Sequence, residues 1–285
     1  MIAAMHAAHP ELSIRRLCAL AGAGRTWYYT RPSPEAVAAR DTALRDAIER
    51  LVLEFPGYGY RRVTKALQRD GWGVNHKRVL RVMRQEALLC QLQRRFVVTT
   101  DSAHALQSYP NLLAGTELTG PDQAWVADLT YIRLPTAFAY LACILDAWSR
   151  RCVGWQLSRW IDTDLTLAAL DHALAARRPE PGLIHHSDRG VQYASAAYVA
   201  RLTDVGAAIS MAAVGNPYEN AKAESFFKTL RGEEVSLNHY QTFHEAEANL
   251  GRFIAEVYNA KRLHSSLGYR PPIEFEEIHA ATTGS

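Results

Sequence analysis

The sequence predicts an α/β protein in which a mixed five-stranded sheet with helices follows a helical N-terminal region. Two observations predict this class. Residues 1–100 carry helical periodicity broken by glycines and prolines, and from Ala124 onward strand-like segments alternate with helical ones. A chain of 285 residues, 48% hydrophobic and 21% charged, is long enough to form more than one domain.

The composition excludes several classes of protein. It is neither disordered nor fibrous, it has no run of eighteen apolar residues, and its opening segment is too short and polar for a signal peptide. We therefore expect a cytoplasmic protein, nucleoid-associated through DNA, with no membrane contact. The cysteines form no C-x-x-C pair, and we expect small buried apolar side chains at Cys18, Cys90, Cys143 and Cys152.

The charge is unevenly distributed along the chain. Residues 1–100 contain 17 Lys and Arg against 8 Asp and Glu, whereas residues 101–285 contain 15 against 21. Basic side chains gain affinity for nucleic acid by releasing condensed counterions, so the first third is predicted to bind a polyanion. The alternative is a solvated helical surface without a partner.

Residues 1–34 predict a first helix-turn-helix. Ser13 is a suitable N-cap for a helix that places Leu17 and Cys18 on one face, and a glycine-bearing turn precedes a second short helix through Trp27. Prolines then interrupt the helical pattern.

Residues 35–95 predict a second helix-turn-helix. Its expected parts are a helix over about 40–54, a helix over 60–70, a glycine turn at 71–73 and a helix over about 76–86 that Asn75 caps. The last helix has Val79, Leu80 and Met83 on one side and a basic stripe largely on the other, which suits contact with phosphates or a major groove. An ordinary amphipathic helix is the alternative. The candidate DNA-binding residues in this region are Arg61, Arg62, Lys65, Lys77, Arg78, Arg81 and Arg84.

Residues 96–121 are predicted to be a linker, and 122–232 the α/β domain. Its expected elements are strands over 124–134, 138–146 and 152–158, a helix over 163–177, a strand over 182–186, a helix from Ser195 to about 205, a strand over 207–211 and a helix containing Glu224. Short turns predict an antiparallel meander for the first three strands. This order is the plan of ribonuclease-H-like folds. Residues 233–285 are expected to form a helical tail.

Three carboxylates are candidates for a functional site. Asp128 lies within the first strand among apolar neighbours, where a charge costs free energy unless it is paired or binds a metal. Asp188 follows the fourth strand, and 35 residues separate it from Glu224. Asp146, at the end of the second strand, is more readily explained as a turn cap. His185 and His186 are adjacent in a strand and point to opposite faces, so we expect one in the core and one lining the cleft.

The chain resembles the second-frame (OrfB) transposases of the IS3 group of bacterial insertion sequences, which belong to the DDE superfamily with retroviral integrases. The resemblance covers nearly the whole chain. The segments that carry it are 58–62 (YGYRR), 125–132 (WVADLTYI), 186–193 (HSDRGVQY), 215–227 (GNPYENAKAESFF) and 258–272 (YNAKRLHSSLGYRPP).

The resemblance implies that Asp128, Asp188 and Glu224 hold two Mg²⁺ ions, with Mn²⁺ as a substitute, for 3′-end cleavage and strand transfer. Carboxylate oxygens are hard ligands that suit Mg²⁺, and three close anions repel one another without divalent charge between them. The implied DNA contacts are Arg231 and Lys228, and the implied supporting residues are Asn220, Gly190 and Gln192. For Arg231 a cation stabilised by the helix dipole is the alternative, for Asn220 a bare helix cap, and for Gly190 simple turn geometry.

The implied partners are double-stranded DNA, namely the terminal inverted repeats and the target, a second copy of the chain on DNA, and an upstream-frame (OrfA) protein or fusion. Two other classes of protein explain the sequence less fully. A DNA-binding regulator would leave the acidic trio without a role, and a ribonuclease-H-type nuclease would not need two helix-turn-helix modules.

Overall fold

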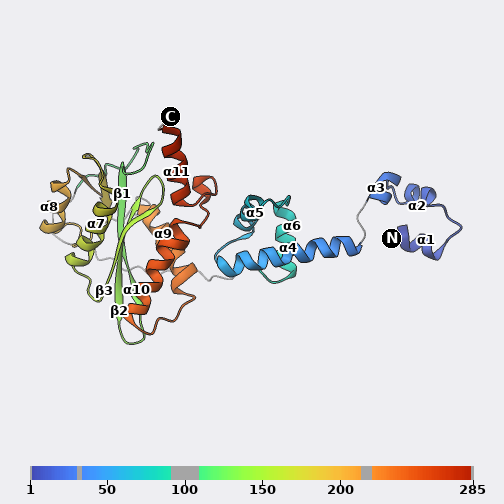
Figure 1. Cartoon of the computed structure of the whole chain (residues 1–285), viewed down its shortest axis with the longest axis horizontal. Coiled ribbons are helices and arrows are strands. Elements are labelled where there is room, and N and C mark those ends of the chain that lie inside the picture. Colours follow the sequence, from blue (N-terminus) through green and yellow to red (C-terminus); the bar gives the residue numbers. More distant parts are fainter. Residues whose placement is uncertain (1, 31–33, 91–108, 213–219, 284–285) are drawn as a thin grey trace.

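The computed structural model describes residues 2–30, 34–90, 109–212 and 220–283. Figure 1 shows the sheet with its helices, the helices α4–α6 beside it, and α1–α3 at the N-terminal end. The helices of the N-terminal region are α1 (Ile2–Ala8), α2 (Ile14–Leu20), α3 (Arg25–Thr30), α4 (Pro34–Glu54), α5 (Tyr60–Arg69) and α6 (His76–Gln85).

The predicted N-terminal helix pair is present. Ser13 caps α2, because its side chain accepts a hydrogen bond from the Arg16 N–H. Leu17 and Cys18 are buried against Ile2 of α1, which completes a small separate core.

The second helical module differs from its prediction in two details. Helix α4 begins at Pro34, earlier than the predicted start near residue 40, since proline is tolerated in the first turn of a helix. On α6 the fully buried residues are Val79, Val82 and Met83, while Leu80 is only half-buried. The predicted cap is present: Asn75 Oδ1 accepts the Arg78 N–H at 2.9 Å.

The sheet has the order β3-β2-β1-β4-β5. Strands β1 (Ala124–Arg133), β2 (Phe138–Asp146) and β3 (Cys152–Ser158) form the predicted antiparallel meander. Strands β4 (Ile184–Ser187) and β5 (Ala208–Met211) add to it in parallel. A mixed five-stranded sheet of this order is the ribonuclease-H-like arrangement, so the predicted fold class is confirmed.

Helices cover both faces of the sheet (Figure 1). Helices α7 (Thr163–Arg177) and α8 (Ala196–Asp204) pack on one face, and α9 (Ala221–Leu230) and α10 (Phe243–Arg252) pack on the other. Strand β3 and α7 approach so closely that a Cβ at Gly154 would lie 2.4 Å from the Ala169 carbonyl oxygen. Because side chains alternate along a strand, successive residues of β1 face different cores, with Trp125 toward α7 and Val126 toward α9.

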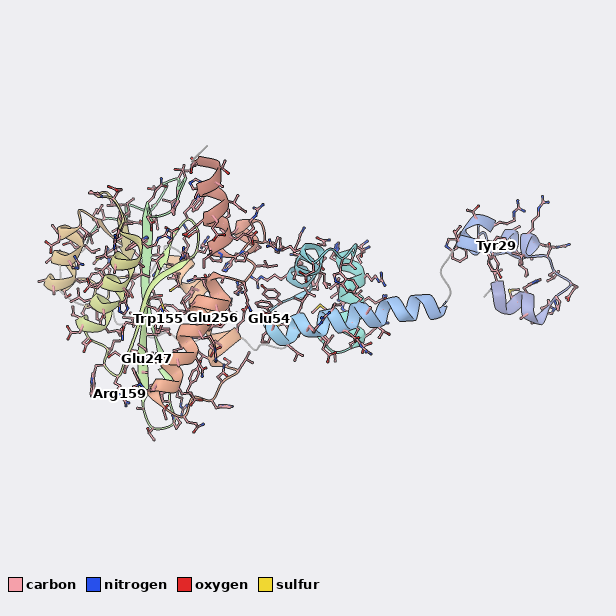
Figure 2. The ribbon with its side chains drawn as sticks, in the orientation of Figure 1. Tyr29, Glu54, Trp155, Arg159, Glu247 and Glu256 are labelled. Atoms are coloured by element: carbon pink, nitrogen blue, oxygen red, sulfur yellow. The ribbon has the colours of Figure 1, made fainter. Side chains whose placement is uncertain are left out.

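The C-terminal tail joins the sheet domain to the helical module. It contains π-helical segments at Arg231–Val235 and Phe253–Asn259, a 3-10 helix at Ser265–Leu267, and helix α11 (Pro272–Thr283). The Leu263 N–H donates to the Tyr58 hydroxyl at 2.7 Å. Lys261 Nζ lies 3.0 Å from Glu54, which Figure 2 labels at the end of α4. The tail thus holds α4 and α5 against the sheet domain.

Two expectations about the surface have different outcomes. Cys18, Cys143 and Cys152 are buried as predicted, but Cys90 is exposed because it lies beyond α6, outside any core. Within the described ranges, no helix is both long and apolar enough to cross a membrane.

Candidate active site

The parallel pairing of β1 with β4 brings Asp128 beside Asp188. Ala124 pairs with Ile184 and Val126 with His186, which is a constant offset of 60 residues. The same offset links Asp128 to Asp188, one step past the end of β4. Neighbouring strands lie about 4.8 Å apart, so Asp128 and Asp188 occupy adjacent positions at the C-terminal end of β4.

Asp128 lies on the α9 side of the sheet in a half-buried position. By strand alternation it shares a face with Val126, which packs in the core beneath α9. Its Oδ1 accepts the Leu129 N–H at 2.8 Å. Burial, followed by the charge of Asp188, raises the pKa of Asp128 to about 8; Glu224 also raises it, whereas the Leu129 N–H and Arg231 lower it.

Asp188 follows β4 directly and is fixed by the turn after it. Its Oδ1 accepts the Gly190 N–H at 2.9 Å. A Cβ at Gly190 would lie 3.0 Å from Asp188 Oδ1 and 3.2 Å from Gln192 Oε1, so a side chain here would crowd both. A glycine at position 190 therefore leaves room for the side chains of Asp188 and Gln192.

Glu224 stands exposed on α9, which begins just before it. Lys228, one turn further, is also exposed. Arg231 follows α9, donates to the Thr130 hydroxyl and lies with its guanidinium carbon 5.6 Å from the centre of the Tyr131 ring. The predicted basic residue thus reaches the same strand as Asp128.

Thr130 was not predicted. Its signal in the sequence is its position two residues after Asp128, which puts both side chains on one face of β1.

Asn220 occupies the N-cap position of α9 but makes no capping hydrogen bond. Its side-chain amide instead donates to the Ala127 carbonyl at 3.2 Å, tying the start of α9 to β1. The bare-cap interpretation is therefore wrong, because the amide is used between elements.

The donor chemistry of the three carboxylates fits a hard divalent cation. Burial and then the charges of Asp188 and Glu224 raise the pKa of Asp128, and a bound cation would offset both effects. Across the described ranges, however, no three His, Cys, Asp or Glu side chains lie close enough together to form a ready-made metal site. Residues 213–219, which precede α9 and contain part of the motif 215–227, lie outside the described residues.

The candidate DNA-binding residues of the helical module fall into three groups. Arg78 and Arg81 both pair with Asp41 at 2.9 Å. Arg62 is half-buried, with its guanidinium carbon 5.7 Å from the Tyr58 ring centre. The third group is exposed and makes no ion pair with any described residue; its members are Arg61, Lys65, Lys77 and Arg84.

Asp146 and the two histidines have structural partners. Asp146 caps its turn through the N–H groups of Trp148 and Ser149, as expected. His185 bonds the Tyr198 hydroxyl and His186 the Ser210 hydroxyl, and both rings are buried. The expectation that one histidine lines the cleft is wrong, because each face of β4 is covered.

Comparison with known proteins identifies the family. Integrase core domain families match residues 119–217 and 205–272, and an HTH-like domain matches residues 39–96. The chain is 37% identical to the transposase for insertion sequence IS904 of Lactococcus lactis, over 88% of this chain and 100% of that protein. It is 33% identical to the transposase InsF for IS3A of Escherichia coli, over 95% of this chain and 96% of that protein.

The chain belongs to the IS3 family of insertion-sequence transposases. This transposase is accordingly a DDE-type polynucleotidyl transferase and endonuclease. Solved structures are more distant. A chain of the simian T-cell lymphotropic virus intasome gives a TM-score of 0.47 at 16% identity, over 77% of this chain and 70% of that chain. The HTLV-2 integrase core with magnesium gives 0.43 at 13%, over 55% and 97%.

Proposed function

We propose that this transposase cuts the 3′ ends of its insertion sequence and joins them to target DNA at Asp128, Asp188 and Glu224. The observation that carries the proposal is the β1–β4 register, which aligns Asp128 with Asp188 on the side of the sheet that α9 covers. Glu224 on α9 adds a third carboxylate that raises the pKa of Asp128.

Two Mg²⁺ ions, or Mn²⁺ in their place, would be held by the three carboxylates and would supply charge stabilisation at the attacking and leaving oxygens of the phosphodiester. The chain's own groups prepare this site. Leu129 N–H and Gly190 N–H each fix one oxygen of an aspartate. Without a cation, Asp128 retains a proton at neutral pH, so binding a cation releases that proton.

Arg231 is proposed to contact the phosphodiester beside the carboxylates. The Thr130 hydroxyl and the Tyr131 ring orient its guanidinium, which remains half-exposed. A guanidinium presents several donors to phosphate oxygens, so it binds and orients the strand at this point. Lys228 extends the same basic face of α9.

We further propose that double-stranded DNA, both the terminal repeats and the target, contacts the exposed cations of α5 and α6. A second copy of the chain on DNA, and an upstream-frame protein or fusion, are proposed partners. The basic excess of residues 1–100 supports the DNA assignment.

The test of the catalytic trio is a cleavage and joining assay. Wild-type protein, alone and fused to its upstream-frame partner, is incubated with labelled element-end DNA and Mg²⁺. Glu224→Gln is expected to lose about a hundredfold or more of the rate, because removing a group that stabilises transition-state charge costs that much. Glu277→Gln, an exposed acid on α11, is the matched control and should retain full activity. Equal rates for wild type and Glu224→Gln would refute the assignment.

A further inference from the structure

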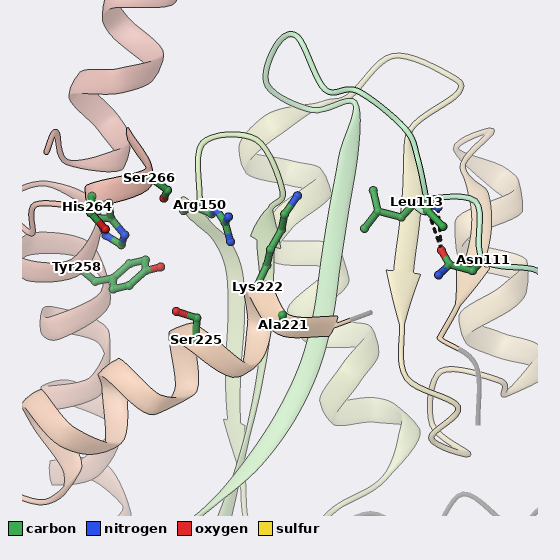
Figure 3. A pocket seen from close by; sticks show the side chains of 11 residues that line it. Asn111, Leu113, Arg150, Ala221, Lys222, Ser225, Tyr258, His264 and Ser266 are labelled. Atoms are coloured by element: carbon green, nitrogen blue, oxygen red, sulfur yellow. Dashed lines mark hydrogen bonds between the residues drawn. The ribbon is translucent and has the colours of Figure 1, made fainter. Parts of the chain in front are cut away.

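A cavity of about 620 Å³ lies between the start of α9, the β2–β3 turn and the C-terminal tail (Figure 3). It does not include the three candidate carboxylates, because none of Asp128, Asp188 and Glu224 lines it, whereas Lys222 and Ser225 of α9 do. The volume is within the range of small-ligand sites.

Two cations line this cavity, and neither has an ion-pair partner within the described ranges. Arg150 and Lys222 are both half-buried, and neither side chain makes an ion pair or hydrogen bond with any described residue. The nearby carboxylate of Asp146 is fully buried and already accepts N–H groups. Burial lowers the pKa of both Arg150 and Lys222; the charge of Arg150 lowers the pKa of Lys222 further, and the charge of Asp146 raises it.

The remaining lining supplies polar groups of the kind that bind a phosphate. Hydroxyl groups come from Ser225, Ser265 and Ser266, and Figure 3 shows the Tyr258 hydroxyl directed toward Ser225. The start of α9 also lines the cavity, and Asn220 does not cap it. A helix N-terminus favours negative charge.

His264 provides an independent indication of a ligand. It is only 9% exposed and lines the cavity, yet its Nε2 has no hydrogen-bond partner among the described residues. A buried polar atom without a partner costs free energy, and in native proteins a ligand or water commonly satisfies it. Within the described ranges, His264 Nε2 thus lacks a hydrogen-bond partner in a cavity that Arg150 and Lys222 also line.

We propose that this cavity binds a backbone phosphate of the DNA strand on which the carboxylate site acts. The inference rests on the proposed function, because it takes the ligand to be the transposase's own DNA. Arg150 and Lys222 neutralise the phosphate charge, the serine hydroxyls and the α9 N-terminus donate to its oxygens, and His264 contacts it through Nε2. The tail thereby contributes directly to DNA binding.

The test measures binding of a fluorescent mixed-sequence DNA duplex to the full-length chain in EDTA over a range of salt concentrations. Arg150→Gln and Lys222→Gln are each expected to weaken binding roughly tenfold and to reduce the slope of log affinity against log salt by about one. Arg201→Gln removes a half-buried cation of α8 that pairs with Asp171 at 2.6 Å on the opposite face of the sheet, and it should leave both quantities unchanged. Thermal unfolding of each variant verifies folding.

A second readout follows the His264 imidazole by NMR in protein labelled with ¹⁵N-histidine. Adding the duplex should shift this resonance in wild type and not in Arg150→Gln. The proposal would be overturned if Arg150→Gln and Lys222→Gln both kept the wild-type affinity and salt slope. It would also be overturned if they lost no more affinity than Arg201→Gln does. The proposal would also be overturned if inorganic phosphate shifted the His264 resonance and the added duplex did not displace that phosphate. DNA binding is measured without Mg²⁺ and so does not depend on cleavage. If the Glu224→Gln variant cleaved DNA at the wild-type rate, the proposed function would be contradicted, but the binding result for the cavity would still be interpretable.

Discussion

At the scale of single residues, Asp128 and Asp146 show how similar strand aspartates acquire different roles. Burial raises the pKa of both carboxyls. Asp146 is sealed from solvent and accepts the N–H groups of Asp122, Trp148 and Ser149, so its oxygens are used within the fold. Among the described residues, Asp128 accepts an N–H from the next residue, Leu129, and the charges of Asp188 and Glu224 act on it. Only the second arrangement favours a cation.

The raised pKa of Asp128 predicts a pH dependence of stability in EDTA. Its folded pKa of about 8 exceeds the ordinary 3.8, so the native state holds a proton that the unfolded state releases between these values. This contribution is complete below pH 3.8 and is lost as pH rises to about 8. Asp128→Asn should therefore lose less free energy of unfolding between pH 5 and pH 8 than wild type does.

Urea unfolding at both pH values measures this difference, and added Mg²⁺ should stabilise wild type more than the variant at pH 8. Identical pH profiles for the two proteins would contradict the assignment of the raised pKa to Asp128.

At the scale of elements, α6 shows that a basic face is not uniformly available. Arg78 and Arg81 lean across to Asp41 of α4, whereas Lys77 and Arg84 have no ion pair among the described residues. The interhelix pairs lower the pKa of Asp41 and hold α4 beside α6. The basic stripe of α6 thus contains two cations that pair with Asp41 and two that make no ion pair with the described residues.

This division predicts unequal effects on DNA binding. Lys77→Gln should lower affinity for a duplex and reduce the salt slope by about one, because it removes an exposed cation. Arg78→Gln should reduce the slope by less, since Asp41 already neutralises part of its charge. Fluorescence anisotropy titrations across salt concentrations provide the comparison, and a larger effect at Arg78 would reverse this interpretation of α6.

At the scale of the whole molecule, the C-terminal tail couples the helical module to the sheet domain. Arg262 of the tail and Glu233, which follows α9, form a pair at 2.8 Å whose side chains are 4% and 7% exposed. A Cβ at Gly57, in the α4–α5 connection, would lie 2.3 Å from the Glu233 side chain. The ion pair is therefore packed between three parts of the chain.

Breaking this pair should destabilise the protein. Glu233→Gln leaves the Arg262 charge buried without compensation and is expected to cost about 3–5 kcal/mol of the free energy of unfolding. The double variant Glu233→Leu/Arg262→Met removes both charges and should recover much of this loss. Chemical denaturation measures both variants, and a double variant as unstable as the single one would show that packing, rather than the unpaired charge, dominates.

Much of the fold and the identity of the candidate acids could be predicted from the sequence. The bounds of β2 and β3 and the caps Ser13, Asn75 and Ser195 depend on local features, namely side-chain alternation and a polar group beside the first turn. Asp128 could be singled out because a carboxylate in an apolar strand is costly wherever the strand packs. Such signals are contained within a few residues.

Tertiary structure alone decided which of these groups meet. The β1–β4 register brings Asp128 to Asp188, Arg78 turns to Asp41 across two helices, and the tail carries His264 to Arg150. Each contact joins segments far apart in the chain, and a periodic pattern does not specify its distant partner. The sequence therefore determined the elements and the chemistry available, while the packing of those elements determined which side chains form a site.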